Sequence, residues 1–181
     1  HMFFTISGGA ASFNTQENSY EDVLKNAKFA LHVSKLNGKN TFTPYSEDEY
    51  LSYIRRIDIQ EELRKCVEND FKGFEVYYQP IMKPQTNTLY GSEALIRWHS
   101  EKYGFMSPVD FVPLLEESAL IIPLGKWIIE NAVRQCKAWV SVYPDFIMNI
   151  NLSFVQIIKS DILKDAVELL EQYELLSLIH I

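Results

Sequence analysis

The 181-residue sequence predicts an α/β fold in which helices pack on a mostly parallel sheet. From residue 71 onward, β-prone runs alternate with segments of helical periodicity, and this alternation is typical of parallel sheets. Hydrophobic residues make up 47% of the chain and aromatic residues 13%, which supplies enough apolar surface for a buried core. The length fits one ordinary domain or two smaller pieces.

The first 45 residues are expected to form a small α/β region. Short strands are predicted at 3–6 and 40–43, and the glycines that follow the first run permit a close approach of backbones. Between the strands, Ser19 has the features of a helix N-cap and Gly38 those of a C-terminal stop.

A polar helix is expected over residues 46–70. Ser46 and Glu49 have the spacing of a capping box, in which each side chain satisfies a backbone group of the other. A long, charge-rich helix between two β-containing regions is typical of a connector between domains. An ordinary surface helix of a single domain fits the same pattern equally well.

Residues 71–181 are expected to contain most of the sheet. The pattern predicts three strands and three longer helices, with the strands at 74–79, 89–98 and 146–152 and the helices at 109–118, 124–139 and 161–173.

The strand that includes Ser92 to Trp98 carries the most informative side chains. Side chains alternate along a strand, so Glu93, Leu95 and Arg97 share one face, and the apolar residues between them pack behind. An acid, an apolar group and a cation on one face suit a site for a metal ion and a phosphate. A half-buried strand with a solvated polar face fits the same pattern.

The charge, the cysteines and the chain start limit the possible roles. A net charge of −7 argues against a broad surface for polymeric nucleic acid. Cys66 and Cys136 match no metal spacing and are expected to be reduced thiols of a cytoplasmic protein. No apolar run reaches the roughly 18 residues of a membrane span, although a parent protein attached to a membrane through upstream regions is compatible with this. His1 and Met2 are typical of a cloning remnant, so the chain is expected to begin inside a larger protein.

From Phe71 to about Tyr173 the sequence resembles the first half of an EAL domain. Members of that family are phosphodiesterases that linearise the bacterial second messenger cyclic di-GMP. Five segments match family motifs in order, which makes the resemblance specific: Tyr78–Ile81, Glu93–Trp98, Phe111–Ser118, Leu124–Trp127 and Asn151–Ser153.

The upstream part is similar, more loosely, to the end of a GGDEF domain, the cyclase fold that makes the same messenger. Ser7–Gly9 and Ala27–Asn40 carry this resemblance. Lys28 stands where that family usually has Asp, His32 where it has Tyr, and Lys39 where it has Arg. The naming loop of the family would lie further upstream, so no cyclase activity is expected from this chain.

The resemblance implies a partial (β/α) barrel of the TIM type, preceded by a GGDEF remnant at 1–45 and the connector helix at 46–70. It implies that Glu93 and Asn151 are ligands of a divalent cation, Mg²⁺ or Mn²⁺. By the same resemblance, Arg97 holds a phosphate of the substrate, and Gln79 and Leu95 line its pocket. Taken alone, Arg97 fits a surface ion pair and Asn151 fits a helix cap. Glu116 and Glu117 are interpreted as a solvated helix face.

The resemblance further implies a fragment of a phosphodiesterase that converts cyclic di-GMP to linear pGpG. The family draws further acidic ligands and a catalytic lysine from later strands, so no catalytic residue is assigned within this chain. The segment 175–181 matches no family motif and is expected to be a truncated or artefactual end. The isolated chain is therefore expected to be inactive.

Two other functions fit the same residues. A degenerate protein of this family would bind cyclic di-GMP as a receptor without cutting it, and an interaction module would have lost the ligand. An open partial barrel leaves a sheet edge and an apolar face uncovered, so self-association is also expected.

Overall fold

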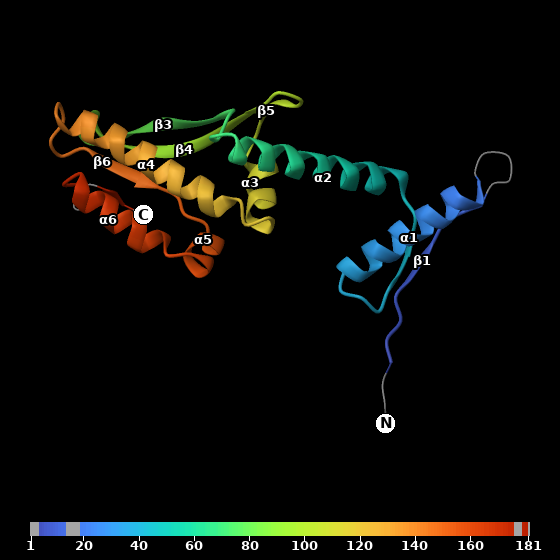
Figure 1. The fold of residues 1–181 in the computed structure, drawn as a ribbon. Helices are drawn as coiled ribbons and strands as arrows, with labels where there is room; N and C mark the ends of the chain where they lie inside the picture. Colours follow the sequence, from blue (N-terminus) through green and yellow to red (C-terminus); the bar gives the residue numbers. More distant parts are fainter. Residues whose placement is uncertain (1–3, 14–18, 176–178, 181) are drawn as a thin grey trace. The chain divides into compact units, whose positions relative to one another are not determined.

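The structure, a computed structural model, describes residues 4–13, 19–175 and 179–180. It divides into two compact units, residues 1–58 and 59–181, and each unit is described by itself (Figure 1). Within the described residues, no helix combines the length and the apolar character needed to cross a membrane.

In the first unit, a two-stranded parallel sheet packs against one helix. Strand β1 (Gly8–Ala10) pairs with strand β2 (Phe42–Pro44), and helix α1 (Tyr20–Leu36) connects them. This is the small α/β arrangement that the strand and helix patterns predict for the beginning of the chain.

Strand β1 lies later in the chain than the predicted run 3–6. Phe4 and Ile6 are each 81% exposed and lie outside any strand, and residue 3 is outside the described residues. Gly9 explains the shift, because a Cβ at that position would lie 2.1 Å from the backbone nitrogen of Leu31 in α1. Only a glycine can bring the strand this close to the helix, so the pairing forms around the glycines and the prediction for residues 4–6 is wrong.

The ends of helix α1 agree with the sequence. Ser19 and Asp22 form a reciprocal capping box at its start, and Gly38, with a φ of +96°, follows its last turn. Asn40 has a φ of 47°, outside the range of extended backbone, and strand β2 accordingly begins at Phe42 and not at residue 40.

The expected polar helix is present as α2 (Glu47–Glu68). At its start, the backbone nitrogen of Glu49 donates a hydrogen bond to the Ser46 hydroxyl over 3.4 Å. The boundary between the two units falls within this helix, after Asp58. The role of the helix as a connector, with domain divisions at residues 45 and 70, stays a prediction.

The second unit is built on a mixed sheet. Its five strands follow the order β3-β4-β6-β7, with β5 paired to the end of β4, and are β3 (Phe74–Lys83), β4 (Thr88–Ser100), β5 (Gly104–Met106), β6 (Ile147–Ile150) and β7 (Ile179–His180). Strands β4, β6 and β7 are parallel, whereas β3 and β5 each run antiparallel to β4.

The prediction of a mostly parallel sheet is therefore wrong at this edge. Residues 84–87 form a tight turn between β3 and β4, in which Asn87 has a φ of 52°. So short a connection permits only an antiparallel pair, because a parallel pair needs a crossover of a dozen or more residues. The short strand β5 and the helix that follows Ser153 were not predicted either.

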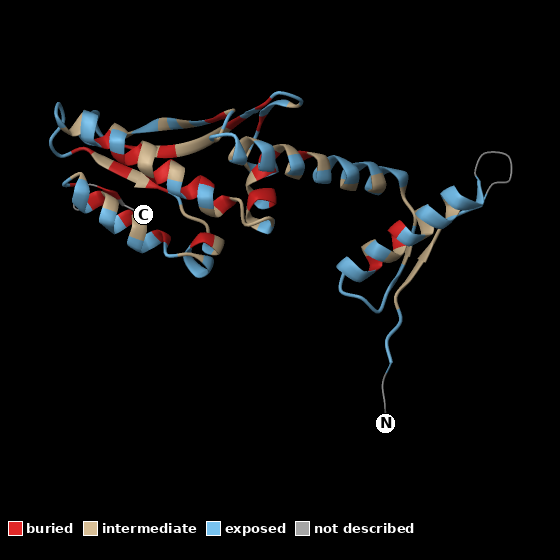
Figure 2. Ribbon diagram, viewed as in Figure 1, coloured by how far each residue is buried: buried red, intermediate tan, exposed pale blue. Residues whose placement is uncertain are grey.

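Besides the second half of α2, the described residues of this unit form the helices α3 (Pro108–Glu117), α4 (Ile121–Val140), α5 (Phe154–Lys159) and α6 (Ile162–Gln172). Figure 1 shows α4 running along strands β4 and β6, with α6 beside it. The pattern of burial follows this arrangement, since the buried positions of α4 face the sheet and α6 (Figure 2). The order in which helices follow strands in this unit fits a barrel of the (β/α) type. The partial barrel itself stays a prediction.

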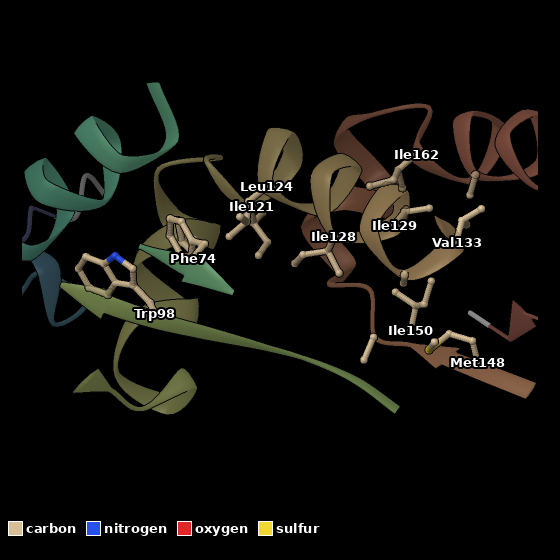
Figure 3. Packing of buried hydrophobic residues seen from close by; sticks show 14 of the residues in the cluster. Phe74, Trp98, Ile121, Leu124, Ile128, Ile129, Val133, Met148, Ile150 and Ile162 are labelled. Atoms are coloured by element: carbon tan, nitrogen blue, oxygen red, sulfur yellow. The ribbon is translucent and has the colours of Figure 1, made fainter. Parts of the chain in front are cut away.

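The core of this unit lies between the sheet and its helices, with contributions from α4 and also from α2, α3 and α6 (Figure 3). Trp98 has no exposed surface and stacks on Phe74, with ring centroids 5.9 Å apart. Cys136 is also fully buried and free, and Cys66 is half-buried and free, as the sequence predicts. Burial raises the pKa of the Cys136 thiol to about 11, so at neutral pH it stays protonated and packs as a small apolar side chain.

Candidate functional site: polar residues on β3, β4 and β6

The predicted site residues lie on neighbouring strands. In the register of β3 with β4, Gln79 is the partner of Glu93, and in the register of β4 with β6, Glu93 is the partner of Asn149. Asn151 comes directly after the last residue of β6. The pairing therefore brings Gln79, Glu93 and Asn151 to one region, although they are far apart in the sequence.

Glu93 and Asn151 are in direct contact. The Asn151 side-chain amide donates a hydrogen bond of 2.6 Å from Nδ2 to Glu93 Oε1. Glu93 is half-buried and Asn151 is exposed, so the pair has access to solvent on one side. Glu93 Oε2 and Asn151 Oδ1 take no part in this hydrogen bond, so each side chain keeps an oxygen atom with which it could contact a further group.

The donor chemistry of the pair fits a hard divalent cation in part. Mg²⁺ prefers carboxylate and amide oxygens, keeps several waters, and is commonly bound by one or two carboxylates plus the phosphates of a substrate. Glu93 Oε2 and Asn151 Oδ1 are oxygens of this kind. Across the described ranges, no three His, Cys, Asp or Glu side chains gather into a metal cage. Glu93 and Asn151 therefore fit a cation that has few protein ligands and do not form a cage that encloses it.

Arg97 lies on the same face of β4 and is held by two contacts. Its Nη1 donates a hydrogen bond of 2.9 Å to the backbone oxygen of Ile96, and its Cζ lies 5.5 Å from the centre of the Tyr77 ring. The guanidinium still has other N–H groups, and a planar guanidinium binds phosphate through paired donors.

A cleft of about 320 Å³ opens beside these residues, between the end of β4, the helices α3 and α4, and the segment after β6. Leu95, Arg97 and Asn151 contribute to its walls. Gln79 lies outside this lining, exposed on strand β3. The structure thus places Leu95, Arg97 and Asn151 around one opening. Glu93 is outside the lining but contacts Asn151, and Gln79 is the strand partner of Glu93.

Two residues of this region were not predicted to belong to a site. Glu116 was interpreted as part of a solvated helix face, but it is half-buried and lines the cleft together with Val112. The spacing of four residues between Val112 and Glu116 puts both on one face of α3, and this signal was available in the sequence. The second residue that was not predicted is Tyr77. Side chains alternate along β3, so Tyr77 and Gln79 lie on the same face of the sheet.

Comparisons with known proteins agree with the sequence motifs. The EAL domain family matches residues 59–178, more than half of the chain. The protein sll1895 of Synechocystis is 34% identical over 168 residues, which is 92% of this chain and 24% of that protein. The cyclic di-GMP phosphodiesterase PdeR of Escherichia coli is 30% identical over 140 residues, which is 76% of this chain and 20% of that protein.

A similar fold occurs among solved structures. The structure of the PaMucR phosphodiesterase in complex with c-di-GMP, from a protein of Pseudomonas aeruginosa, matches with a TM-score of 0.59 and 28% identity. The match covers 65% of this chain and 47% of that one. The chain thus spans about a quarter or less of the curated relatives named above and about half of this structure.

Proposed function

This chain belongs to the EAL domain family, and from that premise we propose that it is part of a metal-dependent phosphodiesterase that hydrolyses cyclic di-GMP to linear pGpG. The observation that carries the proposal is the contact between Glu93 and Asn151, next to the cleft that Arg97 lines. The relative PdeR is named for the same activity, which supports the substrate class.

The residues of the site have distinct roles in this proposal. Glu93 and Asn151 would hold Mg²⁺ or Mn²⁺ through oxygen atoms, and a cation held there would supply polarisation of the phosphodiester and a bound water of lowered pKa. Arg97 binds a phosphate oxygen, while Leu95 and Gln79 contact the nucleotide. Glu116 faces the cleft with a carboxylate, which suits the N–H groups on the edge of a guanine.

Hydrolysis of cyclic di-GMP is expected to need further metal ligands and a catalytic base besides the residues assigned here. Two protein ligands hold a cation weakly, and no residue of the chain is assigned as a catalytic base. We therefore expect the 181-residue chain to bind the nucleotide without hydrolysing it at an appreciable rate. The same site in a protein without further ligands would be a cyclic di-GMP receptor, which is the second candidate function.

Calorimetric titration of the chain with cyclic di-GMP tests the proposal. Binding is expected with and without Mg²⁺, with a higher affinity when Mg²⁺ is present. The variant Glu93→Gln keeps the shape of the side chain and removes its charge, so it should abolish the gain from Mg²⁺ while the circular dichroism spectrum is unchanged. The absence of heat at high protein concentration would reject both the enzyme and the receptor and would leave an interaction module.

For the first unit, we propose a remnant of a GGDEF domain. Its β1–α1–β2 arrangement and the glycine pair packed against α1 support this assignment. A chain of this kind, with a nucleotide as ligand, belongs in the cytoplasm. The tandem arrangement would place the phosphodiesterase directly after a domain of the cyclase fold.

We also expect the chain to self-associate. Phe154 and Ile158 lie one turn apart on α5 and are 75% and 65% exposed. Among the described strands, β3 forms one edge of the sheet. Sedimentation equilibrium at micromolar concentration should show a dimer or larger species, because exposed apolar surface of this kind favours association. The double variant Phe154→Glu, Ile158→Glu should shift it to a monomer.

Val142→Glu is the matched control for self-association, since Val142 is 69% exposed but lies after α4, in another part of this unit. It should leave the association unchanged. A clean monomer for the unmodified chain would contradict the expectation.

A further inference from the structure

Tyr77 lies on the same sheet face as Glu93, Leu95 and Arg97. In the register of β3 with β4, it is the partner of Leu95, and Gln79 is the partner of Glu93. Its side chain is only partly covered, with 48% of the residue exposed. Its ring lies under the Arg97 guanidinium, with 5.5 Å between the ring centre and Cζ.

The ring and the guanidinium interact in a way that leaves the charge available. A cation above the face of an aromatic ring is attracted by its quadrupole. The guanidinium lies over the face of the Tyr77 ring, which offers no hydrogen-bond acceptor of the carboxylate kind, whereas a phosphate is bound through the N–H groups of the guanidinium. Contact with Tyr77 therefore does not compete with a phosphate for Arg97.

Another neighbour of Arg97 would compete. Glu75 is its direct partner in the register of β3 with β4, and side chains at such positions are within reach of each other. A carboxylate pairs with a guanidinium through the same N–H groups that bind a phosphate. An Arg97 side chain free to rotate would thus divide its time between Glu75 and the cleft.

We propose that Tyr77 is a positioning residue for Arg97. Its ring, together with the hydrogen bond from Arg97 Nη1 to the Ile96 carbonyl, holds the guanidinium toward the cleft and away from Glu75. This saves part of the entropy that the long side chain would otherwise lose when a phosphate binds. The consequence for nucleotide affinity rests on the proposed function, but the orientation of Arg97 does not.

Nuclear magnetic resonance of the whole chain tests the orientation without a ligand. In the unmodified protein, the ring current of Tyr77 should shift the side-chain protons of Arg97 upfield. The shift should persist in Tyr77→Phe, which keeps the ring, and should disappear in Tyr77→Leu. Tyr90→Leu is the matched control, because that ring lies 5.3 Å from Lys83 Nζ on the same pair of strands and should not affect Arg97. An Arg97 resonance unchanged by Tyr77→Leu would overturn the proposal.

Titration with cyclic di-GMP tests the consequence. Tyr77→Leu should weaken the affinity about two- to fivefold, the range of an exposed cation–π contact, and Tyr77→Phe should retain the affinity. In an Arg97→Ala background, Tyr77→Leu should cause no further loss, because the ring acts through Arg97. An equal loss in both backgrounds would show that Tyr77 does not act through Arg97 and would overturn the positioning role. If the unmodified chain binds no nucleotide, the proposed function fails, and the resonance of Arg97 still decides the role of Tyr77.

Discussion

Replacing Trp98 with alanine is expected to lower the free energy of unfolding of the second unit by about 3–5 kcal/mol. Trp98 has no exposed surface, and its ring contacts the rings of Phe74 and Phe111, with centroids 5.9 and 5.6 Å away. Truncation removes the apolar area and both aromatic contacts, and leaves a cavity that the rigid strand pair cannot fill. Domains of this size are stable by only about 5–15 kcal/mol, so the loss is a large fraction of the total.

Urea denaturation followed by circular dichroism measures this effect, with Phe105→Ala as the matched control. Phe105 lies on the adjoining strand β5 and is 57% exposed, so its removal should change the free energy of unfolding by about 0.5 kcal/mol or less. If both variants unfold at the same urea concentration, Trp98 is not the centre of the core. The comparison matters for function, because β4 carries Trp98 on one face and Glu93 and Arg97 on the other.

The longer elements could be predicted because their signals are local. The capping box at Ser19 and the glycine at position 38 mark the ends of α1, and the alternation around Trp98 assigns the two faces of β4. Helix α5 was missed although Ser153 and Gln156 form a capping box at its start. At six residues, this helix is too short to show an apolar period, so only the cap was available as a signal.

The remaining features depend on contacts between distant segments. The position of β1 is decided by the packing of Gly9 on α1, and nothing in residues 3–6 contains that information. The candidate site also combines features with a local sequence signal and features that depend on contacts between distant segments. Alternation along β4 groups Glu93 with Arg97, but the hydrogen bond from Asn151 depends on the register of β4 with β6. The resemblance to EAL domains predicts that Glu93 and Asn151 lie close together. The spacing of the two residues in the sequence does not predict this.

Replacing Arg97 with alanine is expected to weaken the binding of cyclic di-GMP about ten- to a hundredfold. Hydrogen bonds to a charged partner contribute about 1.5–3 kcal/mol, and each 1.4 kcal/mol is a factor of ten in affinity. Arg97→Lys keeps the charge but loses the paired N–H donors, so its affinity should fall between those of the unmodified chain and the alanine variant. Calorimetric titration in the presence of Mg²⁺ measures all three.

Arg64→Ala is the matched control for this series, because it removes another guanidinium, 54% exposed on α2, which pairs with Glu61. The affinity should not change in this variant, although the net charge changes by the same amount as in Arg97→Ala. A purely electrostatic attraction of the nucleotide to the chain would weaken equally in both variants and would also decline steeply with added salt. Loss in Arg97→Ala alone would locate the phosphate at the cleft beside Glu93 and Asn151. Equal affinities for the two variants would instead remove Arg97 from the site and leave its contact with Tyr77 as a structural feature of the sheet.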